Sequence, residues 1–323
     1  EIKLFISPEY KIELLSIRGE SLNARIVIDA LFMTLLSKKN IRLSYIVSYI
    51  KHAKPKLVIT FIDNASIFYL VSNAVPNVKT AFVQNGTRGI LGDLFGSLKP
   101  DPSYHVDLMF VHGIEIGKRF SQKIRGEVVP VGSIKNNKMC YIFNRDTEKK
   151  VAFISQWSPP VQNSLFVNAI NYAISHENFF SAELVVLNFL SAWCERNEYE
   201  LVVIGRSKDE GDRLQEHSFF RSLIKGELIF LDPGEISDSY NMIDQCEIVT
   251  HIDSTMGYES LGRGKKTATF SIRSSLLGID GAISGWNFGW PGCYEDAGLF
   301  WTNRVDKSDF RKIMDYLRDI SDH

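Results

Sequence analysis

The sequence predicts an α/β protein that contains two Rossmann-like domains. Three observations support this fold class. Apolar segments without polar–apolar alternation are separated by segments with helical spacing, which is typical of parallel strands covered by helices on both faces. This pattern occurs twice and is interrupted by the polar segment 134–149 (IKNNKMCYIFNRDTEK), which has no clear period. The chain has 323 residues, 45% of them hydrophobic, and is long enough to form two cores.

The first series of strands and helices predicts an N-terminal domain at residues 1–140. Its expected strands are 3–7, 56–62, 79–83, 106–111 and 128–131. Its expected helices are 21–37, 65–74 and 114–124. The strands from 56–62 onward are followed by polar or glycine residues, namely Asp63–Asn64, Gln84–Asn85–Gly86, His112–Gly113 and Gly132–Ser133. Parallel sheets bind ligands outside the carboxyl ends of their strands, so these residues predict one functional edge.

The second series predicts a C-terminal domain at residues 148–323, whose last helix can pack back on the first domain. Its expected strands are 150–154, 200–204, 227–231, 247–252 and 266–270. Its expected helices are 180–196, 210–224, 237–244, a short stretch after Thr255, and 307–320. If the functional edges of the two domains face each other, they form a shared cleft. That arrangement is the GT-B architecture of many glycosyltransferases.

Composition and motif spacing exclude several classes of protein. The formal net charge of −1 argues against nucleic acid as a partner. The four cysteines form no CxxC pair, which fits buried thiols in a reducing cytoplasm rather than a zinc site or disulfide scaffold. No apolar run reaches the roughly 18–20 residues that span a bilayer. Because HxH, HExxH and DxD motifs are missing, we expect no cofactor and metal-independent chemistry.

The segment THIDSTMGYESLGRGKK places several polar residues where a strand gives way to a helix. Ser254 or Thr255 can cap this helix, whose free N–H groups and dipole would attract an anion such as a phosphate. Gly257 would let a ligand approach the backbone, Glu259 could reach a ribose, and His251 could donate to a phosphate or carboxylate. The alternative is a helix cap that binds no ligand. The number of polar groups favours a nucleotide site.

One further loop and three carboxylates add to the candidate site. Gln156 and Ser158 in ISQWSPP could contact a base or phosphate, and the neighbouring Trp157 either stacks on a ring or packs in the core. Asp63 is the first candidate for a catalytic base or nucleophile, with a helix cap as the alternative. The other candidate catalytic carboxylates are Asp93 and Asp253.

Sugar and acceptor recognition is expected from the first domain. Arg88 is notable because acidic sugars need a cation and a guanidinium pairs well with a carboxylate. The other candidates, each of which could instead belong to a solvated loop, are Asn64, Gln84, Asn85, Ser133, Lys135 and Asn136. A cation near the helix after Ser254 would stabilise the departing phosphate. The candidates for that cation are Arg263, Lys265 and Arg273.

The order FIDN…VQNGTRG…VPVGSIKNN…ISQWS…HIDSTMGYESLGRGKK resembles bacterial surface-polysaccharide biosynthesis proteins of GT-B type. Within that group it is most similar to the retaining β-Kdo transferases that use CMP-Kdo. The resemblance implies a CMP-sugar donor held by the C-terminal domain, with its phosphate on Ser254 and Thr255 and with Glu259 or His251 nearby. It implies an acceptor on the N-terminal domain. The His-Pro pair of sialyltransferase-like families does not occur here, so UDP-sugars and other nucleotide sugars stay open.

The predicted function is transfer of an acidic, Kdo-like sugar from a CMP-sugar to a surface glycan of the lipopolysaccharide or capsule type. The alternatives are a UDP-sugar transferase or 2-epimerase, a polyol-phosphate transferase and, outside enzymes, a two-lobed sugar-binding protein. The expected partners are a nucleotide sugar and a glycan or glycolipid acceptor. The expected location is the cytoplasm, with peripheral association at the inner face of the membrane as an option. The start at Glu1 leaves open that the chain is one module of a larger glycosyltransferase.

Overall fold

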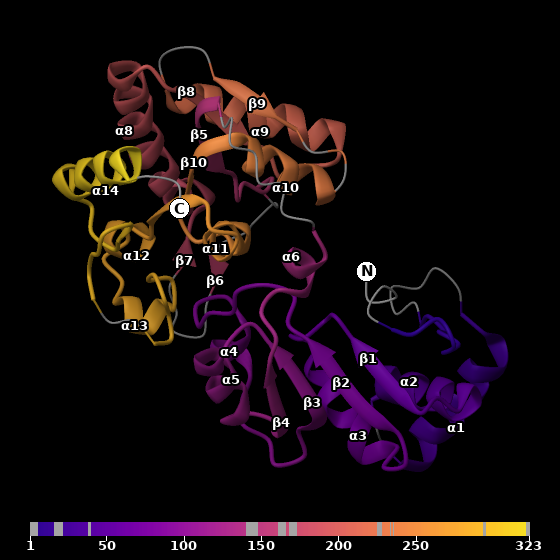
Figure 1. The fold of residues 1–323 in the computed structure, drawn as a ribbon. Helices are drawn as coiled ribbons and strands as arrows, with labels where there is room; N and C mark the ends of the chain where they lie inside the picture. Colours follow the sequence, from indigo (N-terminus) through magenta and orange to yellow (C-terminus); the bar gives the residue numbers. More distant parts are fainter. Residues whose placement is uncertain are drawn as a thin grey trace. The chain divides into compact units, whose positions relative to one another are not determined.

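A computed structural model describes most of the chain (Figure 1). The described residues are 6–15, 22–37, 40–139, 148–160, 166–167, 173–224, 228–232, 234, 236–292 and 295–320. They fall into two compact units: unit 1 comprises Glu1–Asn85 and Leu98–Asn137, and unit 2 comprises Gly86–Ser97 and Lys138–His323. None of the helices within these ranges is long and apolar enough to cross a bilayer.

Unit 1 contains a four-stranded parallel sheet in the order β1–β2–β3–β4. Its strands are β1 (Leu57–Thr60), β2 (Lys79–Val83), β3 (His105–Val111) and β4 (Arg125–Pro130). Its helices are α1 (Ala24–Ser37), α2 (Ile41–Ala53), the 3-10 helix η2 (Ser66–Leu70), α3 (Val71–Ala74), α5 (Ile114–Ser121) and α6 (Ile134–Lys138). The predicted strand at 3–7 lies largely outside the described residues.

Helices α1 and α2 differ most from the sequence-based expectation for unit 1. Helix α2 was not predicted from the sequence. It begins after Asn40, whose side chain accepts a hydrogen bond from the Arg42 N–H. In α1, Ile26 and Ala30 are buried, as a helix with one apolar face requires. A second apolar face of α1 is exposed and consists of Ile28, Leu31, Phe32, Leu35 and Leu36. Helical spacing predicted α1 correctly but not the direction in which it packs.

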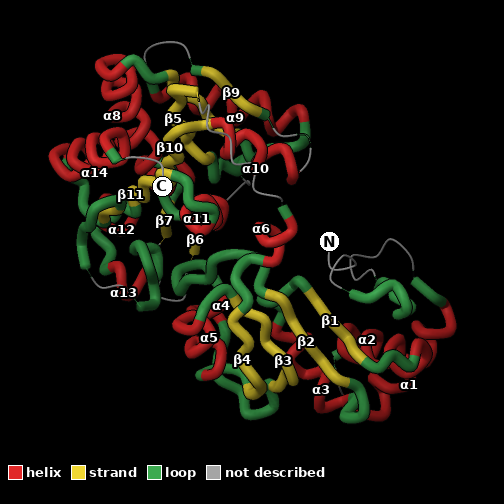
Figure 2. The backbone as a smooth tube through the Cα atoms, in the orientation of Figure 1, coloured by secondary structure: helices red, strands yellow, loops and turns green. Residues whose placement is uncertain are grey.

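Unit 2 contains a six-stranded parallel sheet in the order β12–β11–β10–β5–β8–β9 (Figures 1 and 2). Its strands are β5 (Glu148–Ile154), β8 (Glu200–Ile204), β9 (Ile229–Leu231), β10 (Cys246–His251), β11 (Lys266–Phe270) and β12 (Trp301–Thr302). Numbered along the chain, this order is 6-5-4-1-2-3, which is the Rossmann arrangement read from the other edge. The α/β fold class with parallel sheets is therefore confirmed.

Helices cover both faces of the sheet in unit 2. They are α7 (His176–Phe179), α8 (Ser181–Asn197), α9 (Glu210–Leu223), α10 (Ile236–Gln245), α11 (Thr255–Gly262), α12 (Arg273–Leu276), α13 (Gly281–Ser284) and α14 (Lys307–Asp319). On one face, α8, α9 and α14 pack on side chains such as Phe153 and Phe270. On the other face, α10 and α11 cover the alternate side chains Ala152 and Val249. A short antiparallel pair, β6 (Phe166–Val167) and β7 (Ala173–Ile174), completes the described strands.

The segment Gly86–Ser97, which ends in α4 (Leu94–Ser97), belongs to unit 2 although it lies between β2 and β3 in the sequence. The N–H groups of Ile90 and Leu91 both donate to the Ser284 carbonyl, at 3.3 and 3.0 Å. Leu91 packs with Ile174 and Ile279 in a small buried cluster. The predicted boundary at residue 140 assigned this segment to the first domain, because chain order cannot show which core receives its apolar side chains.

Candidate functional site

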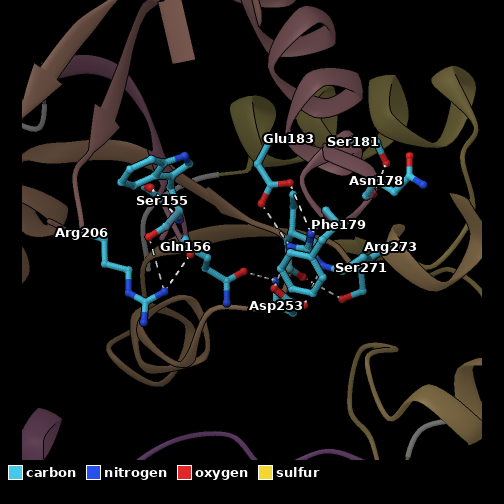
Figure 3. Close-up of polar contacts among 12 residues, drawn as sticks. Ser155, Gln156, Asn178, Phe179, Ser181, Glu183, Arg206, Asp253, Ser271 and Arg273 are labelled. Atoms are coloured by element: carbon cyan, nitrogen blue, oxygen red, sulfur yellow. Dashed lines mark hydrogen bonds and ion pairs between the residues drawn. The ribbon is translucent and has the colours of Figure 1, made fainter. Parts of the chain in front are cut away.

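The carboxyl ends of β5, β8 and β10 are joined by hydrogen bonds at the centre of the unit 2 sheet (Figure 3). The Asp253 N–H, after β10, donates to Oε1 of Gln156, after β5, at 3.3 Å. Arg206, after β8, donates from Nη1 to the Gln156 carbonyl at 2.8 Å. Strands β5 and β10 are neighbours in the sheet, although along the chain they are its first and fourth strands. The strand order therefore reverses between them. Such switch points are where doubly wound sheets bind ligands.

The N-terminus of α11 lies at this switch point. Ser254 is its N-cap residue, has extended backbone angles and makes no capping hydrogen bond with its side chain. The N–H groups of Ser254, Thr255 and Met256 have no acceptor among the described residues. Free N–H groups at the positive end of a helix bind anions well. The predicted phosphate-binding residues Ser254 and Thr255 are therefore placed where a phosphate can approach α11.

The Gly86–Ser97 segment contacts the start of α11. The Thr87 N–H donates to the Thr255 hydroxyl at 2.9 Å, and the two hydroxyl oxygens are 3.3 Å apart. A Cβ on Gly86 would lie 3.3 Å from the same Thr255 oxygen, which is tighter than an ordinary contact. Arg88 follows and donates to the Thr87 carbonyl at 3.2 Å. Arg88, expected on the acceptor side in the first domain, thus lies beside α11 in unit 2.

Arg273 forms a buried charge cluster with two carboxylates (Figure 3). Its Nη2 is 3.1 Å from Glu183 Oε1, and its Nε is 3.2 Å from Asp253 Oδ2. The guanidinium carbon also lies 3.9 Å from the centre of the Phe179 ring, at cation–π distance. The Arg273 side chain is only 1% exposed. This cluster fixes Asp253, the residue immediately before the α11 cap.

The pKa shifts in this cluster follow from burial and charge. Burial raises the pKa of the Glu183 carboxyl, and the Arg273 charge opposes that rise. Burial also disfavours the charged guanidinium, yet Asp253 and Glu183 hold the pKa of Arg273 above its usual value. The guanidinium is therefore charged at any working pH, and it forms ion pairs with these two carboxylates.

Each of the three cations that the sequence suggested for the phosphate has a partner within unit 2. Arg273 is held as described above. Arg263 is buried and pairs with Asp244 through Nε at 3.1 Å. Lys265 is buried and donates to the Asp244 carbonyl at 3.1 Å. Spacing placed all three near α11, but each is buried and packs against the body of unit 2, so we assign none of them to the phosphate.

His251 is completely buried beneath α11 and offers no surface to a ligand. Its Nε2 lies 2.8 Å from the Thr269 hydroxyl, whereas its Nδ1 has no hydrogen-bond partner among the described residues. A Cβ on Gly257 would lie 2.1 Å from the His251 ring. Gly257 therefore makes room for this ring from inside the protein, rather than for a ligand from outside. His251 packs under the helix and does not face a phosphate.

Burial lowers the pKa of His251 to about 4, with a smaller opposing effect from Asp253. The unfolded chain binds this proton near pH 6.5, so stability is full above pH 6.5 and falls as the pH drops toward 4. A shift of this size corresponds to about 3 kcal/mol in the free energy of unfolding. We expect urea denaturation to show that loss between pH 6.5 and 4. His251→Gln should show a shallower dependence, and an equal slope in both proteins would contradict the assignment.

The three candidate catalytic carboxylates are all bound within their own units. Asp63 is fully buried in unit 1, and its Oδ1 accepts from the Asn85 N–H at 3.1 Å. Asp93 accepts from the N–H groups of Gly89 and Leu94, at 2.8 and 2.7 Å. Asp253 pairs with Arg273. Asp63 and Asp93 thus hold loops, and Asp63 has no exposed surface for contacting a substrate.

The remaining residues predicted to bind the donor nucleotide also make contacts within unit 2. Glu259 is buried, and its Oε2 accepts from the Tyr240 hydroxyl at 2.6 Å, which joins α11 to α10. The Ser158 carbonyl lies 2.8 Å from His176 Nε2. Trp157 is 2% exposed and belongs to the main core, so the alternative of a packed tryptophan is correct. Among these candidates, Gln156 lies closest to the switch point.

The sugar and acceptor candidates of unit 1 follow β1, β2 and β4, as predicted for strand ends. Asn64 and Asn85 are exposed. Gln84 is buried, and its Oε1 accepts from the His112 N–H at 2.9 Å. The Ser133 hydroxyl accepts from the Asn136 N–H at 3.3 Å, and Lys135 between them is half-buried. Their role with a sugar or acceptor stays a prediction.

Arg206 and Glu183 were not among the predicted site residues, although Arg206 was expected at a strand end. Arg206 stands directly after the strand ELVVI and Gly205, and this position at a strand end was the signal for it. Glu183 lies in the first turn of α8 and gave no signal, because its partner Arg273 is distant in the sequence. Among the residues that the structure describes, no group of His, Cys, Asp or Glu side chains could hold a metal ion. Metal-independent chemistry stays a prediction.

Comparison with known proteins shows the family to which the chain belongs. Residues 81–323 match the model of a family described as "putative O-antigen biosynthesis protein". No curated protein matches the chain. Among solved structures, a "putative UDP-N-acetylglucosamine 2-epimerase" from Listeria monocytogenes is similar, with a TM-score of 0.52 and 11% identity over 94% of this chain and 74% of that chain. The S. aureus MnaA–UDP complex has a TM-score of 0.50 and 11% identity, over 99% and 76% of the two chains.

A chain of the glycosylation-associated Gap123 complex from Streptococcus agalactiae also matches, with a TM-score of 0.44 and 10% identity. The match covers 88% of this chain and 54% of that chain, so the present chain spans about half its length. At such identities, the similarity to solved structures shows the fold alone. It agrees with the parallel sheets described above.

Proposed function

From the premise that the chain belongs to this family of O-antigen biosynthesis proteins, we propose that it is a glycosyltransferase whose unit 2 binds a nucleotide-sugar donor. One observation carries the proposal. At the switch point between β5 and β10, the N–H groups of Ser254, Thr255 and Met256 have no acceptor among the residues that the structure describes. The phosphate groups of a nucleotide sugar are the anions that this geometry fits.

The same geometry suits the chemistry of sugar transfer. When the bond between sugar and phosphate breaks, negative charge develops on the departing phosphate oxygen. Fixed N–H donors aimed at that oxygen stabilise the charge without reorganising during the reaction. The Arg273 cluster holds the adjacent Asp253 in place, and so helps to fix the start of α11. Catalysis would thus draw on groups that are already ordered before the donor binds.

We propose a UDP-sugar as the donor, in place of the CMP-Kdo that the sequence resemblance implied. The support is the fold similarity to MnaA, whose structure contains UDP, and to the Listeria protein described as a UDP-N-acetylglucosamine 2-epimerase. No comparison supports CMP-Kdo. UDP also presents two phosphates, which the free N–H groups and Arg206 together could contact. The acceptor is proposed to be a growing surface glycan, in line with the family description.

A thermal-shift screen with UDP, CMP, GDP and CDP tests this proposal. At 100 times its dissociation constant, a ligand stabilises the folded protein by about 2.7 kcal/mol. We expect UDP to raise the melting temperature and CMP to leave it unchanged. Stabilisation by CMP alone would restore the Kdo-type donor. A protein that responds to none of the four nucleotides would contradict a nucleotide-sugar enzyme altogether.

A 2-epimerase is the second candidate, because the Listeria protein is described as a UDP-N-acetylglucosamine 2-epimerase and the MnaA structure contains UDP. An epimerase converts its UDP-sugar with no acceptor present, whereas a transferase needs one. Incubation of the protein with UDP-N-acetylglucosamine alone, followed by chromatography of the nucleotide sugars, separates the two. Appearance of the C2 epimer would replace the transferase proposal with this one.

A further inference from the structure

Glu216 in α9 is a completely buried carboxylate. Its oxygens accept from the N–H groups of Arg206, at 3.0 Å, and Ser207, at 2.9 Å, and from the Ser155 hydroxyl. Within the described ranges of the chain, no Lys, Arg or His side chain pairs with it. Burying a carboxylate without a counter-ion is costly, and the hydrogen bonds from these three donors offset that cost.

The loops that Glu216 fixes are those at the ends of two adjacent strands, β5 and β8. Ser155 directly follows β5, and its hydroxyl also accepts from the Trp157 N–H at 3.1 Å. Arg206 and Ser207 follow the second strand. A single buried carboxylate therefore sets the spacing of the two loops beside the switch point, and it fixes the backbone of Arg206 directly.

The Arg206 side chain is exposed but held along one edge only. Its Nη1 donates to the carbonyls of Gln156, at 2.8 Å, and Trp157, at 3.5 Å. The Nε and Nη2 donors have no partner in the described parts of the chain. Figure 3 shows Arg206, Gln156 and Asp253 in a row along the strand ends. The exposed guanidinium therefore has further donors available for an oxyanion.

The charge that a phosphate needs at this site does not come from the cations suggested by spacing. Arg263 and Arg273 are buried and paired with carboxylates, and Lys265 donates to a buried carbonyl. Arg206, in contrast, has its charge next to the switch point and lacks a carboxylate partner among the described side chains. Charge-assisted hydrogen bonds to phosphate are about twice as strong as neutral ones.

We propose that Arg206 binds the phosphate oxygens of the donor and that Glu216 is the residue that positions it. This inference rests on the proposed function, because it assumes a donor that carries phosphate. It adds a cation to the free N–H groups of α11, on the opposite side of Gln156. Neither residue is assigned to a bond-breaking step.

The first test is isothermal titration of UDP into the wild-type protein, Arg206→Ala and Arg206→Lys. Loss of a charge-assisted contact should weaken UDP binding by about tenfold or more in Arg206→Ala, with partial recovery in Arg206→Lys. Raising the salt concentration should weaken UDP binding less steeply in Arg206→Ala than in the wild type. Arg213→Ala is the matched control, since Arg213 is a partly exposed arginine of the same unit. It should bind UDP like the wild type.

The outcomes separate the two proposals. If the wild-type protein does not bind UDP, both the proposed donor and this inference are wrong. If the wild type binds UDP and Arg206→Ala binds it equally well, only the role of Arg206 is wrong. Equal losses in Arg206→Ala and Arg213→Ala would show a general effect of surface charge, and would also overturn the assignment.

The second test concerns Glu216. Glu216→Gln keeps the shape of the side chain but weakens its hold on the Arg206 and Ser207 N–H groups, so UDP binding should weaken. If Glu216 acts through Arg206, the double variant Glu216→Gln/Arg206→Ala should bind UDP no more weakly than Arg206→Ala alone. A further loss of the full Glu216→Gln size in the double variant would contradict positioning. Circular dichroism melting confirms that each variant is folded.

Discussion

Gly257→Ala is expected to lower the free energy of unfolding by about 3 kcal/mol, which is the upper end of the usual cost of overpacking a core. The new Cβ would lie 2.1 Å from the His251 ring, far inside any van der Waals contact. The ring cannot move aside easily, since it is completely buried and hydrogen-bonded to the Thr269 hydroxyl on β11. Relief would require α11 to lift from the sheet. The free N–H groups at its start would then move, so UDP binding should be lost as well.

Gly262→Ala, in the same helix, is the matched control. A Cβ at Gly262 meets no atom within 4 Å. Alanine is also the better helix former, so this change should be neutral or stabilise by up to about 1 kcal/mol. Urea denaturation of both variants gives the comparison. If Gly257→Ala proved as stable as Gly262→Ala, the close packing of His251 under α11 would be wrong.

Arg273→Met should destabilise unit 2 by about 3–5 kcal/mol, the usual result of removing one partner from a buried ion pair. The variant leaves the buried Glu183 without its cation and releases Asp253 at the switch point. Protonation of Glu183 would reduce the loss, because burial already raises the pKa of that carboxyl. We therefore expect the destabilisation to be larger at pH 8 than at pH 5.

Arg304→Met serves as the control for a pair near the surface. The Arg304 side chain is 53% exposed and lies 2.7 Å from Asp309. Asp309 is only 11% exposed, but the exposed guanidinium keeps the pair in contact with water, so we expect a loss of about 1 kcal/mol, well below that of Arg273→Met. Chemical denaturation at the two pH values measures both variants. Similar small losses in Arg273→Met and Arg304→Met would show that the buried cluster does not stabilise the second unit.

The sequence predicted strands better than it predicted the contacts of individual side chains. The bounds of β2, β8 and β11 coincide with the predicted segments, because their β-branched, apolar runs have few alternatives. Helix α2 was not predicted, although Asn40 caps it. The Gly86–Ser97 segment joins the unit that follows it, a choice made by apolar contacts with residues far along the chain.

The candidate site shows the same limit. The position of Ser254 and Thr255 at the start of α11 followed from a polar cluster after an apolar strand. The roles of Arg273 and Arg206 could not be predicted from the sequence. Both are arginines near strand ends, and they differ only in neighbours that are distant along the chain. Arg273 pairs with Glu183 in the core. Glu216, in contrast, accepts from the backbone N–H of Arg206, and the Arg206 side chain stays exposed. Spacing in the sequence identifies which residues are near a strand end, but not the direction in which each side chain points.

The central claim is that phosphate binds at the start of α11, and hydrogen–deuterium exchange with and without UDP tests it most directly. The amides of Ser254, Thr255 and Met256 have no acceptor among the described residues, so they should exchange quickly in the free protein. With saturating UDP we expect peptides covering these residues, and those covering Gln156 and Arg206, to exchange more slowly. UDP binding that protects other segments while leaving these peptides unchanged would contradict the claim.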